Sequence, residues 1–170
     1  NYCSWGAGSG GHLAMESLKK QAGIDMVHIA YKGSAPCVQD LIGGQVDAGF
    51  ADSSTTVEIV RSGRVRALAY SGSKRLPMLP DVPTMNEAGY PFTNYSWYGL
   101  FAPAATPPAI VDELNRAVSA TLKDPAIIKR FNDMNFNDLP QTTPQSFADT
   151  IRKDLSDWRA LVEAVGIKLD

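Results

Sequence analysis

The chain has 170 residues, of which 44% are apolar, and its formal net charge is -2. This composition predicts a soluble globular protein with one full core or two small lobes, and it provides no basic surface for nucleic acid. The longest apolar stretches fall far short of the roughly 20 residues that span a bilayer. No signal peptide opens the chain; Asn1–Ser4 already has a strand pattern, so we expect that further sequence precedes it.

Residues 1–70 alternate between strand-like and helix-like runs. The expected strands are Tyr2–Trp5, Met26–Tyr31, Ala48–Ala51 and Val65–Tyr70, and the expected helices are His12–Ala22, Ala35–Ile42 and Thr56–Ser62. This order predicts an α/β fold with a parallel sheet and right-handed crossovers. On such a sheet, ligands bind beyond the carboxyl ends of the strands.

Three turns rich in glycine and serine follow the first three strands: Gly6–Gly11, Tyr31–Pro36 and Asp52–Thr55. A helix N-terminus has unpaired backbone N–H groups and the positive end of the helix dipole, and small residues let an anion come close to them. The sequence therefore predicts an anion site at this sheet edge. Its candidate ligand-binding residues are Ser4, Gly8, Ser9, Gly33, Ser34, Asp52 and Ser53.

The second half of the chain has a different pattern. Prolines and glycines make Ser71–Pro91 irregular, and strand patterns occur at Tyr95–Ala102 and near Asn135–Leu139. Three helices are expected to begin at the pairs Thr106-Pro107, Asp124-Pro125 and Thr143-Pro144. Two helical stripes, Ile110–Leu122 and Phe147–Val165, are apolar and need a partner surface. We therefore expect a complete α/β ligand-binding lobe over 1–98, and helices of an incomplete second lobe over 99–170.

The first turn also satisfies the G-x-G-x-x-G pattern of dinucleotide-binding proteins. That pattern needs an acidic residue after the second strand, where this chain has Tyr31-Lys32-Gly33. A P-loop is excluded because no Lys-Ser or Lys-Thr pair follows the glycines. Ser9 nearly matches a nucleophile elbow, but Ala7 replaces the first glycine of that motif. An α/β enzyme acting on a carboxylate or nucleotide remains the alternative, although no acid/base pair is evident.

Several side chains have two interpretations. Cys3 and Cys37 are either buried free thiols or, at the ends of neighbouring strands in an oxidising compartment, a disulfide. Lys32 is either an anion ligand or a solvated loop residue, and Asp52 either caps the next helix or hydrogen-bonds a hydroxylated ligand. Two histidines are too few for a zinc or catalytic site, and His28 is expected to pack in its strand. No metal or cofactor is predicted.

Six motifs follow one another along the chain: Ser4–Ala14, Tyr31–Pro36, Gly43–Asp47, Leu79–Thr84, Glu87–Pro91 and Trp97–Pro103. Together they resemble the Bug family, the substrate-binding components of tripartite tricarboxylate transporters, over the whole chain. The resemblance implies a periplasmic, non-enzymatic protein with a type II periplasmic binding protein-like fold. Such a protein captures a small organic carboxylate in a cleft between two lobes, and its partners are membrane permease subunits.

The resemblance also implies how this chain differs from its relatives. Family members usually have alanine at the position of Trp5, so this ring either narrows the pocket or stacks on an aromatic ligand. They also carry an N-terminal half-lobe before the position of Asn1. We expect the lobes to close about the Tyr95–Leu100 crossover, where Trp97–Gly99 forms the hinge. Self-association is one way in which this chain would cover its apolar helices.

Overall fold

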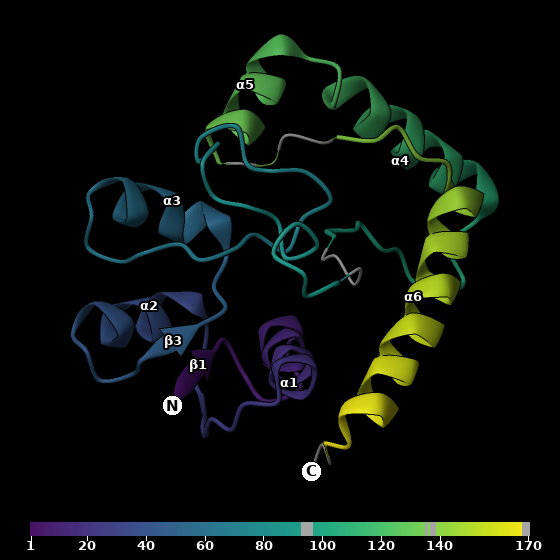
Figure 1. Ribbon diagram of the computed structural model, residues 1–170. Helices are drawn as coiled ribbons and strands as arrows, with labels where there is room; N and C mark the ends of the chain where they lie inside the picture. Colours follow the sequence, from purple (N-terminus) through teal and green to yellow (C-terminus); the bar gives the residue numbers. More distant parts are fainter. Residues whose placement is uncertain (93–96, 135, 137–138, 168–170) are drawn as a thin grey trace. The chain divides into compact units, whose positions relative to one another are not determined.

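The computed structural model describes residues 1–92, 97–134, 136 and 139–167. The chain divides into two compact units, Asn1–Tyr95 with Trp158–Asp170 as the first and Ser96–Asp157 as the second. Figure 1 labels all of the elements except β2. They are β1 (Tyr2–Ser4), α1 (Gly10–Ala22), β2 (His28–Ala30), α2 (Ser34–Ile42), β3 (Ala48–Gly49), α3 (Ser53–Arg61), α4 (Pro108–Thr121), α5 (Pro125–Asp133) and α6 (Pro144–Val165). No helix within the described ranges has the length and apolar character needed to cross a membrane.

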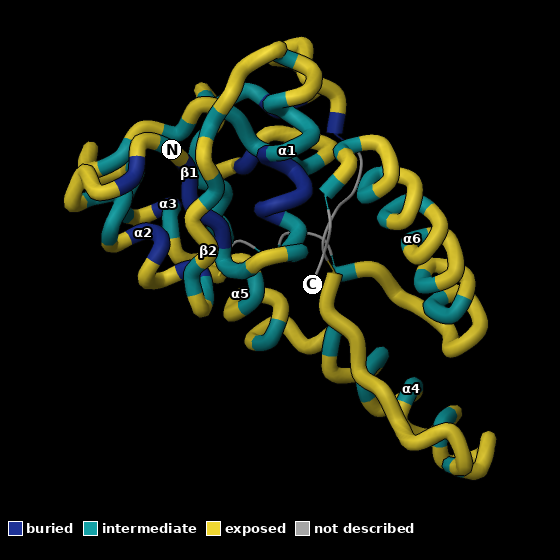
Figure 2. The backbone as a smooth tube through the Cα atoms, turned by 90° about the horizontal axis from the view of Figure 1, so that it is seen from below, coloured by how far each residue is buried: buried dark blue, intermediate teal, exposed yellow. Residues whose placement is uncertain are grey.

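The first unit is built on a parallel sheet with the strand order β2-β1-β3. Tyr2 of β1 lies opposite His28 on one side and Ala48 on the other, and both pairings are parallel. All three residues of β1 are fully buried, and Figure 2 shows that buried positions gather on β1 and α1. The predicted α/β fold with a parallel sheet is therefore confirmed, although its strands are shorter than expected.

The prediction of a fourth strand at Val65–Tyr70 is wrong. The only pairing in this stretch, within the described part of the chain, is a parallel bridge between Tyr70 and Thr84. The Tyr70 N–H donates to the Pro83 carbonyl at 2.8 Å, and the Met85 N–H donates to the Tyr70 carbonyl at 2.8 Å. Its backbone therefore bonds to the following irregular segment instead of extending the sheet beside β3.

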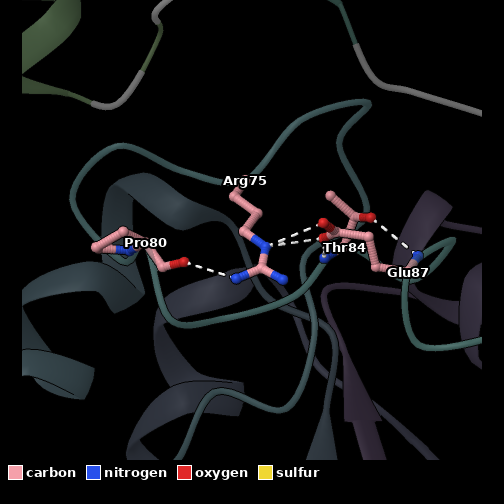
Figure 3. A network of polar contacts seen from close by, with 4 residues as sticks. All are labelled: Arg75, Pro80, Thr84 and Glu87. Atoms are coloured by element: carbon pink, nitrogen blue, oxygen red, sulfur yellow. Dashed lines mark hydrogen bonds and ion pairs between the residues drawn. The ribbon is translucent and has the colours of Figure 1, made fainter.

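The segment Ser71–Pro91 is irregular, as predicted, and a polar network holds it together (Figure 3). Glu87 accepts from the Arg75 Nε at 3.0 Å and from the Thr84 N–H at 2.7 Å, while Arg75 donates to the Pro80 carbonyl at 3.0 Å. The hydrogen bonds from Arg75, and then those from Thr84, lower the pKa of Glu87. Side-chain contacts thus replace the backbone ladder that the prolines interrupt.

Two apolar clusters form the core of the first unit. In the larger one, α1 packs on the irregular segment and on the end of α6; it contains Ala14, Met85 and Phe92, with Leu18, Phe50, Ala69, Trp158 and Leu161 against them. Part of the predicted stripe Phe147–Val165 is therefore covered within this unit. The smaller cluster contains Cys3, Cys37 and Val46.

Cys3 and Cys37 form a disulfide with their Cα atoms 5.6 Å apart, so the interpretation as free thiols is wrong. Cys37 lies in α2 and not at a strand end, contrary to the expectation. The bond therefore ties the central strand to the helix after β2. Gly49 gives it room, because a Cβ there would be 2.7 Å from the Cys3 sulfur.

The second unit contains α4, α5 and the first part of α6. The α5 and α6 helices begin where predicted: Asp124 accepts from the Ala126 N–H at 2.7 Å, and Thr143 accepts from the Ser146 N–H at 3.1 Å. Thr106 does not cap α4, whose N-cap position is Pro107. No residue of α4 or α5 is fully buried, and the apolar stripe of α4 is only partly covered: Ile110 and Leu114 are exposed, while Val111 and Val118 are half-buried.

The two strands expected in the second half are not found where the structure describes them. Residues 97–102 are not a strand, and Tyr95 lies outside the described residues. Most of the expected strand Asn135–Leu139 also lies outside them. Trp97 instead packs edge-on against Phe147, with ring centroids 5.0 Å apart. The assignment of 99–170 to a second lobe, and of Trp97–Gly99 to a hinge, remains a prediction.

Candidate functional site

The three predicted turns meet at the carboxyl edge of the β2-β1-β3 sheet. The Gly33 N–H donates to the Trp5 carbonyl at 3.2 Å, which joins the turn after β2 to the turn after β1. The Asp52 N–H donates to the Ser34 hydroxyl at 3.1 Å, which joins the turn after β3 to the start of α2. The predicted site residues Ser4, Gly8, Ser9, Gly33, Ser34, Asp52 and Ser53 all belong to these turns or to the strand and helix ends beside them.

The turn after β1 is held by hydrogen bonds to its own residues. Ser9 is the N-cap of α1: its hydroxyl accepts from the His12 N–H at 3.3 Å, and its N–H donates to the Gly6 carbonyl at 3.2 Å. Gly8 has a left-handed φ of 70°, and its N–H donates to the His12 Nδ1 at 3.0 Å. The backbone amides of Gly8 and Ser9 are therefore engaged within the turn and do not face a ligand.

Free donors lie in the first turns of both helices. Among the described residues, none accepts a hydrogen bond from the backbone N–H of Gly10, Gly11, Ser34 or Ala35. These groups belong to the first turns of α1 and α2, where the helix dipole is positive. The N–H groups of Gly8, Ser9 and Gly33 bond within the fold, and a sequence pattern does not reveal these bonds. The set of ligand-binding residues remains a prediction.

Asp52 occupies the N-cap position of α3, but its carboxylate does not cap the helix. The Asp52 carbonyl takes that role and accepts from the Thr55 N–H at 3.0 Å and from the Thr56 hydroxyl at 2.9 Å. Its carboxylate has no hydrogen-bond or ion-pair partner in the described part of the chain, and burial raises its pKa. Of the two sequence interpretations, capping by this side chain is wrong, and a bond to a ligand remains a prediction.

Trp5 lies over the start of α1. A Cβ built on Gly11 would be 2.4 Å from the Trp5 ring, so the ring packs directly on the backbone at this position. Gly11 is therefore required by its contact with Trp5, and the bare backbone beside the free amides is partly covered by an indole ring.

His12 and His28 are not among the predicted site residues, yet both contact the first turn. His12 accepts from Gly8, and the His28 Nε2 lies 2.8 Å from the Ser4 hydroxyl. The two imidazole rings stack, with centroids 3.8 Å apart and planes 10° apart. His28 is packed, as predicted. The sequence signal for His12 was its position three residues after the N-cap Ser9, which brings its ring back towards the turn.

Two further features of the site were considered from the sequence: Lys32 as an anion ligand, and a metal site. Lys32 is exposed on the turn after β2. In the described ranges, no cluster of three or more His, Cys, Asp or Glu side chains could hold a metal ion.

Comparison with known proteins identifies the family. The model of the tripartite tricarboxylate transporter family receptor matches residues 1–167. BugT of Bordetella pertussis (strain Tohama I) is 36% identical over 163 residues, which cover 95% of this chain and 50% of that protein. The chain thus spans about half the length of most of its curated relatives, as with BugT. It belongs to the tripartite tricarboxylate transporter receptor family, which includes the Bug proteins.

Solved structures of similar proteins contain carboxylates. An R. palustris protein solved with adipate is 30% identical, with a TM-score of 0.88, and the match covers 98% of this chain and 56% of that one. MatC from Rhodopseudomonas palustris, solved with bound malate, is 34% identical with a TM-score of 0.82, covering 95% of this chain and 56% of that one. The chain has the fold of periplasmic binding proteins, with one lobe and part of a second.

Proposed function

We propose that this family member binds a small organic carboxylate at the three linked turns and forms part of a periplasmic receptor that delivers it to a membrane permease. The observation that carries the proposal is the set of free backbone donors at the first turns of α1 and α2, on a sheet edge where the turns bond to one another. Hydrogen bonds from such donors to a carboxylate are each worth roughly 1.5 to 3 kcal/mol.

The ligand-binding residues that we propose are the predicted ones, with roles adjusted to their contacts. Ser9 would contribute its hydroxyl group and Ser34 its backbone N–H, while Ser4, Gly8 and Gly33 fix the shape of the turns. Asp52 and Ser53, at the start of α3, would contact the ligand from the third turn. Because Asp52 is an acceptor when ionised, it would select a ligand with a hydroxyl or ammonium group near the carboxylate. Hydroxylated dicarboxylates such as malate fit this description.

The proposal for the complete protein includes a second lobe and a cleft. Residues 99–170 would be the C-terminal part of that lobe, and closure about the Tyr95–Leu100 crossover would bury the ligand. The Cys3–Cys37 disulfide supports an oxidising compartment such as the periplasm.

The alternative, an α/β enzyme, is not favoured. Catalysis on a carboxylate or nucleotide would require an acid/base pair that converges on the bound substrate. Asp52 has no acidic or basic partner among the described residues, and the two histidines bond to the turn itself. We therefore propose binding without chemistry.

Introducing a negative charge at Ser9 tests this function. Aspartate and asparagine both serve well as helix N-caps, so Ser9→Asp and Ser9→Asn should fold equally well. Only Ser9→Asp places a negative charge against the bound carboxylate. At about 100 times its dissociation constant, a bound carboxylate should stabilise the wild-type protein and Ser9→Asn by roughly 2.7 kcal/mol.

Thermal unfolding with a panel of mono- and dicarboxylates provides the measurement. The proposal predicts that a carboxylate raises the Tm of the wild-type protein and of Ser9→Asn but not of Ser9→Asp. A rise caused by nucleotides and not by any carboxylate would favour the enzyme alternative.

A further inference from the structure

Two histidine rings hold the turn after β1 by hydrogen bonds, and the bond to His12 depends on the protonation of its ring. The Gly8 N–H donates to the His12 Nδ1 at 3.0 Å, so this nitrogen must carry a lone pair. In the neutral ring, the proton is then on Nε2. A protonated His12 would present an N–H to the N–H of Gly8, and two donors cannot bond to each other.

His28 holds the same turn from the neighbouring strand. Its Nε2 lies 2.8 Å from the Ser4 hydroxyl, and that hydroxyl donates its one hydrogen to the Gly6 carbonyl at 2.9 Å. His28 Nε2 is therefore the donor, and this bond persists when the ring is protonated. The Ser4 oxygen also accepts from the Gly6 N–H at 3.3 Å and from the Ser9 hydroxyl at 3.4 Å. Ser4 is fully buried, so its hydroxyl has no alternative partner in water. The two histidines therefore fix opposite ends of one short turn.

The rings are also stacked on each other and on a tyrosine. The centroids of His12 and His28 are 3.8 Å apart, and those of His28 and Tyr2 are 4.9 Å apart. Two charged imidazolium rings in face-to-face contact would repel each other strongly. Burial is the main cause that lowers the pKa of both rings, and the charge of His12 lowers the pKa of His28 further.

The charged groups around the pair come from β1 and α1. Glu16 accepts from the Tyr2 hydroxyl at 2.6 Å and from the Lys19 ammonium at 2.8 Å. Glu16 raises the pKa of both histidines, whereas Lys19 lowers it. Because Glu16 is already bonded to Tyr2 and Lys19, it does not pair directly with either imidazole.

We propose that His12 is a positioning residue that holds the Gly6–Gly11 turn in its binding shape only while its ring is neutral, so that the affinity for an anionic ligand falls as the pH is lowered. The effect on affinity rests on the proposed function, because it assumes that the N–H groups of Gly10 and Gly11 bind the anion. The hydrogen bond from the Gly8 N–H to His12 does not itself depend on a ligand.

Simple electrostatics predicts the opposite slope. A histidine that only contributes charge near an anion would bind it more tightly when protonated. A histidine that positions the turn would weaken binding when protonated, because the bond to Gly8 is lost. The sign of the pH dependence therefore separates positioning from plain attraction.

His12→Asn is the decisive variant. The asparagine Oδ1 provides an acceptor near the position of Nδ1 and does not titrate, so it should keep the bond to Gly8 at every pH. His12→Phe keeps the stacked ring and loses the acceptor. We expect His12→Asn to bind ligand as well as the wild-type protein at neutral pH, and His12→Phe to bind more weakly throughout.

Nuclear magnetic resonance of the ¹⁵N-labelled chain measures the positioning directly. The sequence has 2 histidines, so their ring signals are readily assigned. At neutral pH, we expect His12 to be protonated on Nε2, and we expect the Gly8 amide signal to shift with the His12 titration at a pH below the ordinary value of 6.5. The proposal would be overturned if His12 carried its proton on Nδ1 at neutral pH. It would also be overturned if the Gly8 amide signal did not shift as His12 titrates.

Calorimetric titrations with malate and adipate then test the effect on binding. As the pH is lowered from about 7.5 through the His12 pKa, the wild-type affinity should fall relative to His12→Asn, and a linked pKa shift of about one unit limits this fall to about tenfold. Protonation of the ligand itself affects both proteins alike and cancels in this ratio. Equal slopes in the two proteins, or tighter wild-type binding at low pH, would contradict the proposal. If neither anion binds while the Gly8 amide follows His12, the proposed function fails and the positioning role stands.

Discussion

The Asp52 N–H donates to the Ser34 hydroxyl at 3.1 Å, and this bond joins the turns that begin α2 and α3. The same hydroxyl lies 3.1 Å from the Thr55 hydroxyl, and Ser34 is only 8% exposed. A single buried oxygen therefore fixes the spacing of two helix N-termini at the candidate site.

We predict that Ser34→Ala destabilises the protein and weakens carboxylate binding. It leaves the Asp52 N–H without an acceptor, which costs about 1 to 3 kcal/mol in a buried position. Chemical denaturation with and without malate measures both effects. Ser54→Ala, at an exposed position in the first turn of α3, is the matched control and should change stability little. An equal loss in both variants would show that the bond to Asp52 has no special role.

Asp52→Asn should stabilise the protein at neutral pH while it weakens binding. Burial raises the pKa of Asp52, so the folded state disfavours the ionised carboxylate, and folding is penalised above that raised pKa. The penalty disappears as the pH falls towards the ordinary value of 3.8. The Tm difference between Asp52→Asn and the wild-type protein should therefore be positive at neutral pH and smaller near pH 4.

The binding effect of the same substitution depends on the ligand. Malate has a hydroxyl group that would donate to Asp52, whereas adipate has none, so Asp52→Asn should reduce malate affinity more than adipate affinity. Calorimetry with both ligands measures the ratio. An equal change for the two acids would contradict a direct bond between Asp52 and the ligand.

Gly11→Ala should destabilise the protein because its Cβ would lie 2.4 Å from the Trp5 ring. Overpacking of this kind costs about 1 to 3 kcal/mol. Trp5→Ala should remove most of that cost when combined with Gly11→Ala, so the double-mutant cycle is strongly non-additive. Additive free energies of unfolding would mean that the two residues do not touch in solution.

Reduction of the Cys3–Cys37 disulfide should lower the free energy of unfolding by about 2 to 4 kcal/mol. The bond closes a loop with a sequence separation of 34 residues, and both cysteines are fully buried. Urea denaturation with and without a reductant measures the loss. The double variant Cys3→Ala/Cys37→Ala should not respond to the reductant, and two free thiols in the denatured, unreduced protein would refute the bond.

The helices and the parallel sheet follow from local signals that the sequence carries. Alternation of strand and helix patterns predicts the parallel sheet, and cap residues with proline predict the starts of α5 and α6. The strand expected at Val65–Tyr70 does not form, although its apolar pattern is typical of a strand, because the backbone of Tyr70 bonds to Pro83 in the irregular segment that follows. Strand formation depends on such partners more than helix formation does.

The location of the candidate site could be predicted from the sequence, but its hydrogen bonds could not. The glycines and serines identify the three turns, because small residues at helix N-termini allow anions to approach. The sequence does not reveal that Gly8 bonds to His12 or that Gly33 bonds to Trp5, since these are tertiary contacts. They decide which amides stay free, and those of Gly10 and Gly11 are among them.

Amide chemical-shift mapping with malate and adipate tests carboxylate binding at the linked turns most directly. On titration, we expect saturable shifts that are largest at Gly10, Gly11 and Ala35, and that are absent in Ser9→Asp but present in Ser9→Asn. Saturable shifts confined to α4–α6, or shifts that are equal in the two Ser9 variants, would contradict binding at the carboxyl edge of the sheet.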